Sequence, residues 1–292
     1  MRDYLIYLVV RLFISIVQAL PLEKAVAWGD VWAWLASDVF RIRGRLVAEN
    51  LRFAFPEKSE EERHLIQHEM WRHLFRMVVE TAFAERKIHL TNWKQYVELV
   101  REVPPLRAMY EGRPVIFATG HLGNFEFAGY VLGLIGIPAY TVARTLDNRY
   151  LDRYLGRFRR SSGQAIIPKD KAAPMLREAM QLGKSLAILT DQHAGKKGVK
   201  AISFGRVVST HKVISILAQT YHAPVAISSS IRQERKPFHF VIEVSEFLEV
   251  TENPEFAGTK EMAQWYNDCM ERLIRRNPEQ YWWLHNRWRE KS

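Results

Sequence analysis

Cysteine is almost absent from this sequence of 292 residues, which contains only Cys269. No disulfide can form within the chain and no cysteine-rich metal site exists, so we expect a reducing compartment or one in which cysteine is irrelevant. A phosphate-binding loop is also missing, because the segment Gly195-Lys-Lys-Gly198 lacks the Walker spacing. The sequence has no internal repeat and no low-complexity stretch, and its length suits one large α/β domain.

Positive charge, in contrast, is in excess. The chain has 42 lysines and arginines against 32 acidic residues, which gives a net charge of +10 at pH 7. Such an excess suits a polyanionic partner, namely nucleic acid, an anionic membrane surface or a phosphorylated lipid. Nine tryptophans favour lipid among these partners, because indole rings prefer the membrane interface.

One long apolar run stands at the N-terminus, from Tyr4 to Leu20. At about 100° per residue its more polar members share one stripe of a helix, and the other faces are aliphatic or aromatic. The stripe consists of Tyr4, Tyr7, Arg11, Ser15 and Gln18. We expect residues 1–21 to form a membrane-anchoring helix, in or tilted through the interface, with Arg11 reaching toward the headgroups. A signal peptide is disfavoured, because no small-x-small cleavage site precedes Pro21.

The remaining residues, 22–292, are expected to form one domain in which strands and helices alternate. Ser59 and Glu62 form a capping box that predicts a helix over 60–86. Short apolar runs predict strands over 113–119, 139–143, 163–167, 185–190, 224–231 and 238–245. Helical patterns cover 125–135, 148–161, 172–182, 210–221 and 258–276, and residues 192–206 read as a loop. This alternation predicts an α/β fold with an open mixed sheet flanked by helices.

The first buried strand is followed by His121 and, five residues later, Glu126. Active sites of open α/β sheets gather at the carboxyl ends of strands, so this turn is the leading candidate for chemistry. Gly123 and Asn124 allow a turn in which the Glu126 carboxylate folds back to the imidazole, giving a base and its orienter. The alternative is structural, with Asn124 as a helix N-cap and Glu126 favoured by the helix N-terminus.

Several motifs accompany this turn along the chain. They are Asn50-Leu-Arg-Phe-Ala-Phe-Pro56, Thr119–Glu126, Gly156-Arg-Phe-Arg159, Asp191-Gln192 with Phe204-Gly205, and Pro278-Glu-Gln-Tyr-Trp-Trp-Leu-His285. Together they resemble the late acyltransferases of lipid A biosynthesis, within the wider His-x4-Asp/Glu glycerolipid acyltransferase-like group. The resemblance covers nearly the whole chain, including the hydrophobic N-terminus. His-x4-Glu alone is a weak pattern, whereas its combination with the C-terminal segment is specific.

The resemblance implies roles for individual residues. His121 would deprotonate an acceptor hydroxyl, Glu126 would hold its tautomer, and Arg159 would stabilise the oxyanion. Arg157 or backbone N–H groups of the 120–124 turn are the alternatives for that donor. Substrate-binding positions would be Arg144, Asn148, Arg157, Asp191 and Asn124.

The function implied is transfer of a fatty acyl chain from an acyl carrier protein to a lipid A precursor. It would take place at the cytoplasmic face of the cell inner membrane, without metal, cofactor or nucleic acid. Two alternatives stay open: an acyl-CoA-dependent phosphatidylinositol mannoside acyltransferase, and a non-catalytic protein that binds anionic membranes or nucleic acid.

Two further patterns bear on ligands. One face of the helix over 148–161 would carry four arginines, Arg149, Arg153, Arg157 and Arg160. A bound polyanion would relieve the repulsion between them. The alternative is a face that water solvates. His64 and His68 lie one helical turn apart and could form a metal pair, and the segment from His68 to His73 misses the zincin spacing by one residue. No third ligand is evident, so we expect no metal site.

Overall fold

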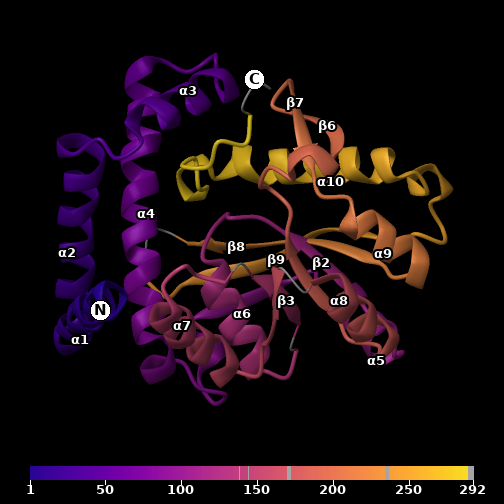
Figure 1. The fold of residues 1–292 in the computed structure, drawn as a ribbon, viewed down its shortest axis with the longest axis horizontal. Helices are drawn as coiled ribbons and strands as arrows, with labels where there is room; N and C mark the ends of the chain where they lie inside the picture. The colour runs from indigo at the N-terminus through magenta and orange to yellow at the C-terminus, as the bar shows by residue number, and fades with distance from the viewer. Residues whose placement is uncertain (138, 144, 170–171, 234–236, 289–292) are drawn as a thin grey trace.

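The computed structural model describes residues 1–137, 139–143, 145–169, 172–233 and 237–288. A twisted sheet lies at the centre with helices on both of its faces, and a layer of N-terminal helices stands along one side (Figure 1). The described helices are α1 (Arg2–Ala19), α2 (Leu22–Trp34), the π-helix η1 (Leu35–Val39), α3 (Gly44–Ala54), α4 (Glu60–Lys87), α5 (Val103–Tyr110), α6 (Phe125–Leu134), α7 (Arg149–Ser161), α8 (Ala172–Gln181), α9 (Val213–Tyr221) and α10 (Thr259–Arg276). The described strands are β1 (Val97–Val100), β2 (Ile116–Thr119), β3 (Tyr140–Ala143), β4 (Ala165–Pro168), β5 (Leu186–Leu189), β6 (Val199–Ser203), β7 (Arg206–Thr210), β8 (Val225–Arg232) and β9 (Phe240–Leu248).

Seven of the strands in the described residues form the main sheet, in the order β1-β9-β8-β2-β5-β3-β4. Strands β8, β2, β5, β3 and β4 are parallel to one another, whereas β9 pairs antiparallel with β8 and parallel with β1. The expected α/β fold with an open mixed sheet is therefore confirmed. Two details differ: β1 was not expected, and β6 and β7 form a hairpin where the sequence read as a loop.

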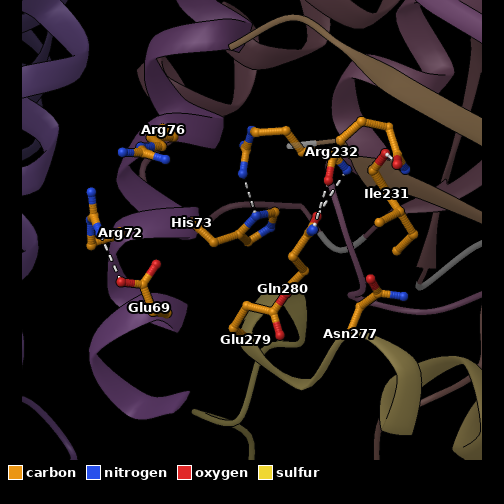
Figure 2. Close-up of a pocket in the computed structure, with 10 residues that line it drawn as sticks. Glu69, Arg72, His73, Arg76, Ile231, Arg232, Asn277, Glu279 and Gln280 are labelled. Atoms are coloured by element: carbon orange, nitrogen blue, oxygen red, sulfur yellow. Dashed lines mark hydrogen bonds and ion pairs between the residues drawn. The ribbon is translucent and has the colours of Figure 1, made fainter. Parts of the chain in front are cut away.

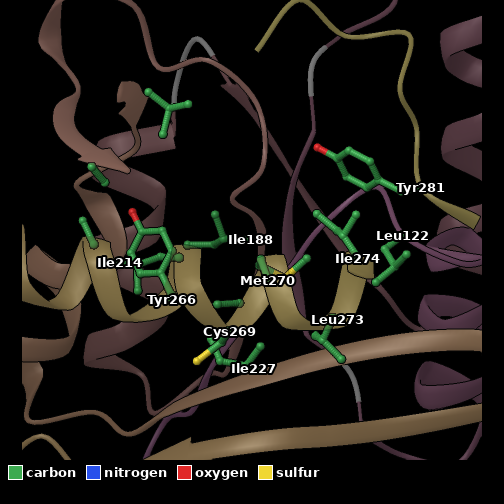
Figure 3. Packing of buried hydrophobic residues seen from close by; sticks show 14 of the residues in the cluster. Leu122, Ile188, Ile214, Ile227, Tyr266, Cys269, Met270, Leu273, Ile274 and Tyr281 are labelled. Carbon is green, nitrogen blue, oxygen red and sulfur yellow. The ribbon is translucent and has the colours of Figure 1, made fainter. Parts of the chain in front are cut away.

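The larger core lies between the sheet and helices α8, α9 and α10. Figure 3 shows Met270 and Leu273 of α10 beside Ile188 of β5 and Ile227 of β8. Each such buried aliphatic side chain contributes about 1.5–3 kcal/mol of transfer free energy. Leu122, from the turn after β2, belongs to the same cluster, so that turn is anchored in the core.

The N-terminal helix α1 turns its polar stripe toward the protein. The rings of Tyr4 and Tyr7 lie 5.1 Å and 5.8 Å from the ring of Tyr150 on α7. The Arg11 guanidinium lies 4.5 Å above the ring of Tyr154, which corrects the expectation that Arg11 reaches away toward headgroups. A cation over an aromatic face is favourable and leaves the apolar side of α1 facing outward.

That outward side carries a continuous set of exposed apolar residues. On α1 they are Leu5, Ile6, Leu8, Val9, Leu12, Phe13 and Ile16, and on α2 they are Trp28, Val31, Trp32 and Trp34. We call these residues the apolar surface. Among the described residues no helix is long and apolar enough to cross a membrane.

Candidate active site

The candidate site lies where two neighbouring parallel strands end. Strand β2 ends at Thr119 and pairs with β5, which ends at Leu189. The pairing continues one residue further, because the Thr190 N–H donates to the Thr119 carbonyl at 2.8 Å. The segments that follow, with His121 after β2 and Asp191 after β5, therefore meet at the carboxyl edge of the sheet.

The Asp191 carboxylate holds His121 at two points. The His121 ring lies with Nδ1 2.9 Å from one carboxylate oxygen, and the His121 backbone N–H donates to the other at 3.0 Å. Because an ionised carboxylate only accepts hydrogen bonds, Nδ1 carries the proton. The other ring nitrogen, Nε2, is then the basic one, and it lies 3.3 Å from the Gln192 side-chain nitrogen.

Apolar rings enclose this imidazole. Phe125 and Trp282 meet it edge-on, with ring centroids 5.1 Å and 5.6 Å away. The His121 side chain is 17 % exposed and that of Asp191 only 4 %, so solvent screens their attraction weakly.

Burial and charge act in opposite directions on the pKa values of the pair. Burial disfavours the charged imidazolium, but the Asp191 carboxylate, assisted by Glu126, outweighs it and raises the pKa of His121 above 6.5. Burial likewise disfavours the Asp191 carboxylate, but His121 and Arg287 hold its pKa well below 3.8. The pair therefore consists of an ionised carboxylate and an imidazole whose basicity is enhanced.

Glu126 has a different partner from the one expected. It lies in the first turn of α6, where it forms an ion pair with Arg159 from the last turn of α7. The Arg159 Nε–H donates to one Glu126 carboxylate oxygen at 2.9 Å, and Nη2 donates to the other. The expected contact between Glu126 and the imidazole is replaced by the Asp191 contact, and Glu126 acts on His121 through its charge.

The turn that carries His121 requires glycine. Gly123 has φ of +65°, and a Cβ there would lie 1.7 Å from the Ser230 carbonyl oxygen. The close approach serves the turn, because the Asn124 N–H donates to that same oxygen at 2.9 Å. The N–H groups of His121, Gly123 and Asn124 all donate within the protein, so these three do not provide the alternative oxyanion donors.

The C-terminal motif holds this turn in place. The Gly123 N–H donates to the Gln280 carbonyl at 2.9 Å, and the Trp282 N–H donates to the His121 carbonyl at 3.0 Å. His285 accepts the His193 N–H at Nε2, at 3.0 Å, and burial lowers the pKa of His285 to about 4. The motif is visible in the sequence by resemblance, but its contacts with the turn after β2 depend on the fold.

The other expected site residues fall into three groups. Asn124 and Asn148 are helix N-caps, and the Asn148 amide also donates to the Asp3 carbonyl at 2.7 Å, so both side chains are used within the fold. Arg157 is exposed on α7, and it is Arg159 that pairs with Glu126. Arg144 lies outside the described residues.

No group of three or more histidine, cysteine, aspartate or glutamate side chains in the described part of the chain could hold a metal ion. His64 and His68 both contact Asp38, at 3.4 Å and 2.8 Å, which gives them a partner on η1. His73 lies in a separate buried cluster, where its Nε2 contacts the Gly123 carbonyl of the turn after β2.

A carboxylate-held imidazole at the carboxyl edge of an α/β sheet, within reach of the charge of the Glu126–Arg159 ion pair, has the parts expected of a group-transfer enzyme that activates a hydroxyl. Comparison with known proteins gives the same class. Over 261 residues the chain is 26 % identical to the lipid A biosynthesis palmitoleoyltransferase of Escherichia coli (strain K12), covering 87 % of this chain and 81 % of that protein. The lipid A biosynthesis acyltransferase of Shigella flexneri gives the same values, and the lauroyltransferase of Escherichia coli (strain K12) is 23 % identical over 266 residues, or 87 % of this chain and 82 % of its own.

Residues 1–290 match the family described as bacterial lipid A biosynthesis acyltransferase. The chain therefore belongs to that family, and it is an acyltransferase.

Proposed function

We propose that this acyltransferase moves a fatty acyl chain from an acyl carrier protein thioester to a hydroxyl group of a lipid A precursor, with His121 as general base. The names of the relatives support the acceptor class. The observation that carries the mechanism is the Asp191 hydrogen bond to Nδ1 of His121, because it leaves Nε2 unprotonated.

The reaction proceeds in two steps. The acceptor hydroxyl attacks the thioester carbonyl while Nε2 of His121 takes its proton, and a tetrahedral intermediate forms with negative charge on the former carbonyl oxygen. The C–S bond then breaks, and the imidazolium returns its proton to the departing thiolate. The products are an ester and a free thiol. Asp191 holds the imidazole tautomer and stabilises the imidazolium in between, which is the part first expected of Glu126.

Arg159 supplies the positive charge for the oxyanion. Its guanidinium is part-buried, so its field is weakly screened, and Glu126 fixes its orientation through two hydrogen bonds. Glu126 thus has two effects: it positions Arg159, and its charge contributes to the raised pKa of His121. Gln192 lies on the Nε2 side of the imidazole, where the acceptor hydroxyl replaces it as the hydrogen-bond partner.

The exposed arginines of α7 provide the contact with acceptor phosphates. Arg153, Arg157 and Arg160 are exposed on the helix whose last turn carries Arg159. Stacked like charges repel, and a bound phosphate relieves that repulsion. In this arrangement the anionic headgroup is held a short distance from the reacting hydroxyl.

The apolar surface of α1 and α2 is the membrane-docking face, at the cytoplasmic side of the inner membrane. A helix that packs its polar stripe on the protein and exposes an apolar side is suited to lie in the interface plane. Exposed Arg41 and Arg45 stand next in the chain, near exposed Phe40 and Ile42, and attract anionic headgroups.

The test of the reaction uses purified protein with two donors, acyl carrier protein and coenzyme A thioesters, and two acceptors, a lipid A precursor and a phosphatidylinositol mannoside. We expect transfer from the carrier protein to the lipid A precursor, with the product identified by mass spectrometry. His121→Ala should lower that rate by at least about 100-fold while lipid binding is retained. Full activity of His121→Ala, or transfer only to the mannoside, overturns the proposal.

The test of the docking face uses vesicles with and without phosphatidylglycerol. Leu12→Glu should weaken vesicle binding about tenfold, because one aliphatic side chain contributes about 1.5–3 kcal/mol when fully buried. Leu182→Glu makes the same change at an exposed leucine that directly follows α8, away from α1 and α2, and should leave binding unchanged. Equal binding by both variants contradicts an interfacial α1.

A further inference from the structure

A buried polar cluster lies directly beneath the catalytic turn, and the reaction proposed above does not use it. Its members are His73 and Glu80 of α4, Asn124, Arg232 at the end of β8, and Gln280, and their exposed fractions range from 0 % to 8 %. His73 and Glu80 are seven residues apart, two turns along the same face of α4. Charged groups buried this deeply are costly unless they are paired.

Arg232 fixes the protonation of His73. Its Nε and Nη2 groups each donate to a Glu80 oxygen at 2.6 Å, and its Nη1 group donates to Nδ1 of His73 at 2.7 Å. Arginine only donates hydrogen bonds, so Nδ1 of His73 must accept and the ring proton stands on Nε2. Burial, then the charge of Arg232, hold the pKa of His73 well below 6.5, so the ring stays neutral.

The Nε2–H of His73 donates to the Gly123 carbonyl at 3.2 Å. On the other side, the Asn124 amide donates to Glu80 at 2.9 Å and accepts the Phe127 N–H at 3.0 Å, which caps α6. The cluster therefore holds the turn after His121 and also the helix that carries Glu126.

Gln280 closes the cluster from the C-terminal side. Its side chain accepts the Arg232 N–H at 2.9 Å and donates to the Arg232 carbonyl at 3.0 Å, and its own carbonyl accepts the Gly123 N–H. Figure 2 shows His73 between Arg232 and Gln280, at the edge of a cavity of about 240 Å³. The Arg72 and Arg76 guanidinium groups on the cavity wall pair with Asp30, so we assign the cavity no anionic ligand.

We propose that His73 is a positioning residue for acyl transfer: through the Gly123 carbonyl it sets the place of His121 relative to Glu126 and Arg159. The inference rests on the proposed function. A general base must lie within hydrogen-bond reach of its proton, and a displacement of about 1 Å costs about 100-fold in rate.

Two substitutions separate the two hydrogen bonds of His73. A glutamine amide reaches the place of Nε2, so His73→Gln keeps the donor to Gly123 and loses the acceptor for Arg232. An asparagine amide reaches the place of Nδ1, so His73→Asn keeps the acceptor and loses the donor to Gly123. We expect His73→Asn to lower kcat about 10- to 100-fold with KM for the acceptor unchanged, and His73→Gln to retain most of the activity.

Val244→Ala controls for a loss of activity that comes only from lower stability. Val244 lies on β9 and packs in a separate cluster with Val115 and Ala226, so the variant leaves a cavity away from the site. Thermal unfolding of all variants gives the folded fraction, to which rates are normalised. Equal activity of His73→Asn and His73→Gln, or a matching loss of normalised activity in Val244→Ala, overturns the inference. The activity of His121→Ala tests only the proposed function, so a failure of that function can be distinguished from a failure of the role of His73.

Discussion

Asp191→Asn replaces one carboxylate oxygen by an amide nitrogen at the point where Asp191 holds His121. The His121 backbone N–H needs an acceptor, so the amide oxygen takes that place and the NH₂ group turns toward Nδ1. A donor facing Nδ1 forces the ring proton onto Nε2, where the acceptor hydroxyl has to be deprotonated. The variant keeps the shape of the site and inverts the tautomer of its base.

The expected loss in kcat is about 100- to 10,000-fold, the range observed when a general base is held in the wrong tautomer. The pH dependence changes as well. In the native protein His121 must lose its proton to act, so kcat/KM rises with pH through an apparent pKa above 6.5. Removing the negative charge of Asp191 removes the main cause that raises this pKa, and the acid limb of the remaining activity moves to lower pH.

The assay measures initial rates of acyl transfer by mass spectrometry from about pH 5 to about pH 9, a range that spans the acid limb. Asp268→Asn makes the same change at an exposed carboxylate on α10 and should leave rates within about twofold. A loss of less than about fivefold in Asp191→Asn, together with a larger loss in Glu126→Gln, would refute the reasoning and return the orienting role to Glu126.

Three further outcomes are expected. Gly123→Ala should abolish activity and lower the free energy of unfolding by at least about 2 kcal/mol, because its Cβ would lie 1.7 Å from a carbonyl oxygen. Gly112→Ala also has a left-handed φ but open space around the Cβ, so it should stay active. Rates of acyl transfer and thermal unfolding measure both effects. Arg157→Gln should raise KM for the phosphorylated acceptor about tenfold and leave kcat unchanged in steady-state kinetics. In urea unfolding, the free energy of unfolding of the native protein and that of Asp191→Asn should differ most between pH 3.8 and pH 6.5. The Asp191 carboxylate, whose pKa is lowered by folding, stops stabilising the fold as pH falls below this window. The His121 imidazolium, whose pKa is raised by folding, stops stabilising it as pH rises above the window.

Local patterns in the sequence predicted local structure well. The capping box of Ser59 and Glu62 is present, and Asn124 caps α6 as its position before the apolar run indicated. Both depend on residues three positions apart, so a single sequence contains all the information they need. The strands that end just before His121 and Asp191 were also predicted, because a short run of mainly apolar residues is itself a local signal.

The hairpin of β6 and β7 was missed for a local reason. Its two-residue turn has positive φ at both Phe204 and Gly205, which is the conformation of a type I′ turn. Asparagine or aspartate usually occupies the first of these positions, and phenylalanine there hides the signal. The neighbouring lysines and glycines then made the segment read as a loop.

The partner of His121 could not be found from spacing at all. Glu126 is close in sequence, whereas Asp191 is 70 residues away and arrives through the pairing of β2 with β5. Strand order in an open sheet is a tertiary property that one sequence does not determine. Nearness along the chain therefore predicted a contact between Glu126 and the imidazole, whereas Asp191 makes that contact.

Helix α7 links α1 to the candidate site. Its first half packs against α1 through Tyr150 and Tyr154, and its last turn places Arg159 on Glu126. An enzyme that takes one substrate from a bilayer and the other from solution needs its reacting groups at the boundary between them. Because α7 contacts both α1 and the ion pair, the proposed docking of α1 on lipid would also set the distance of Arg159 from that lipid. Tyr150→Ala, which removes the ring that α1 packs on, should therefore lower the rate on vesicle-bound acceptor more than on detergent-dispersed acceptor, and an equal effect in both assays would separate docking from catalysis.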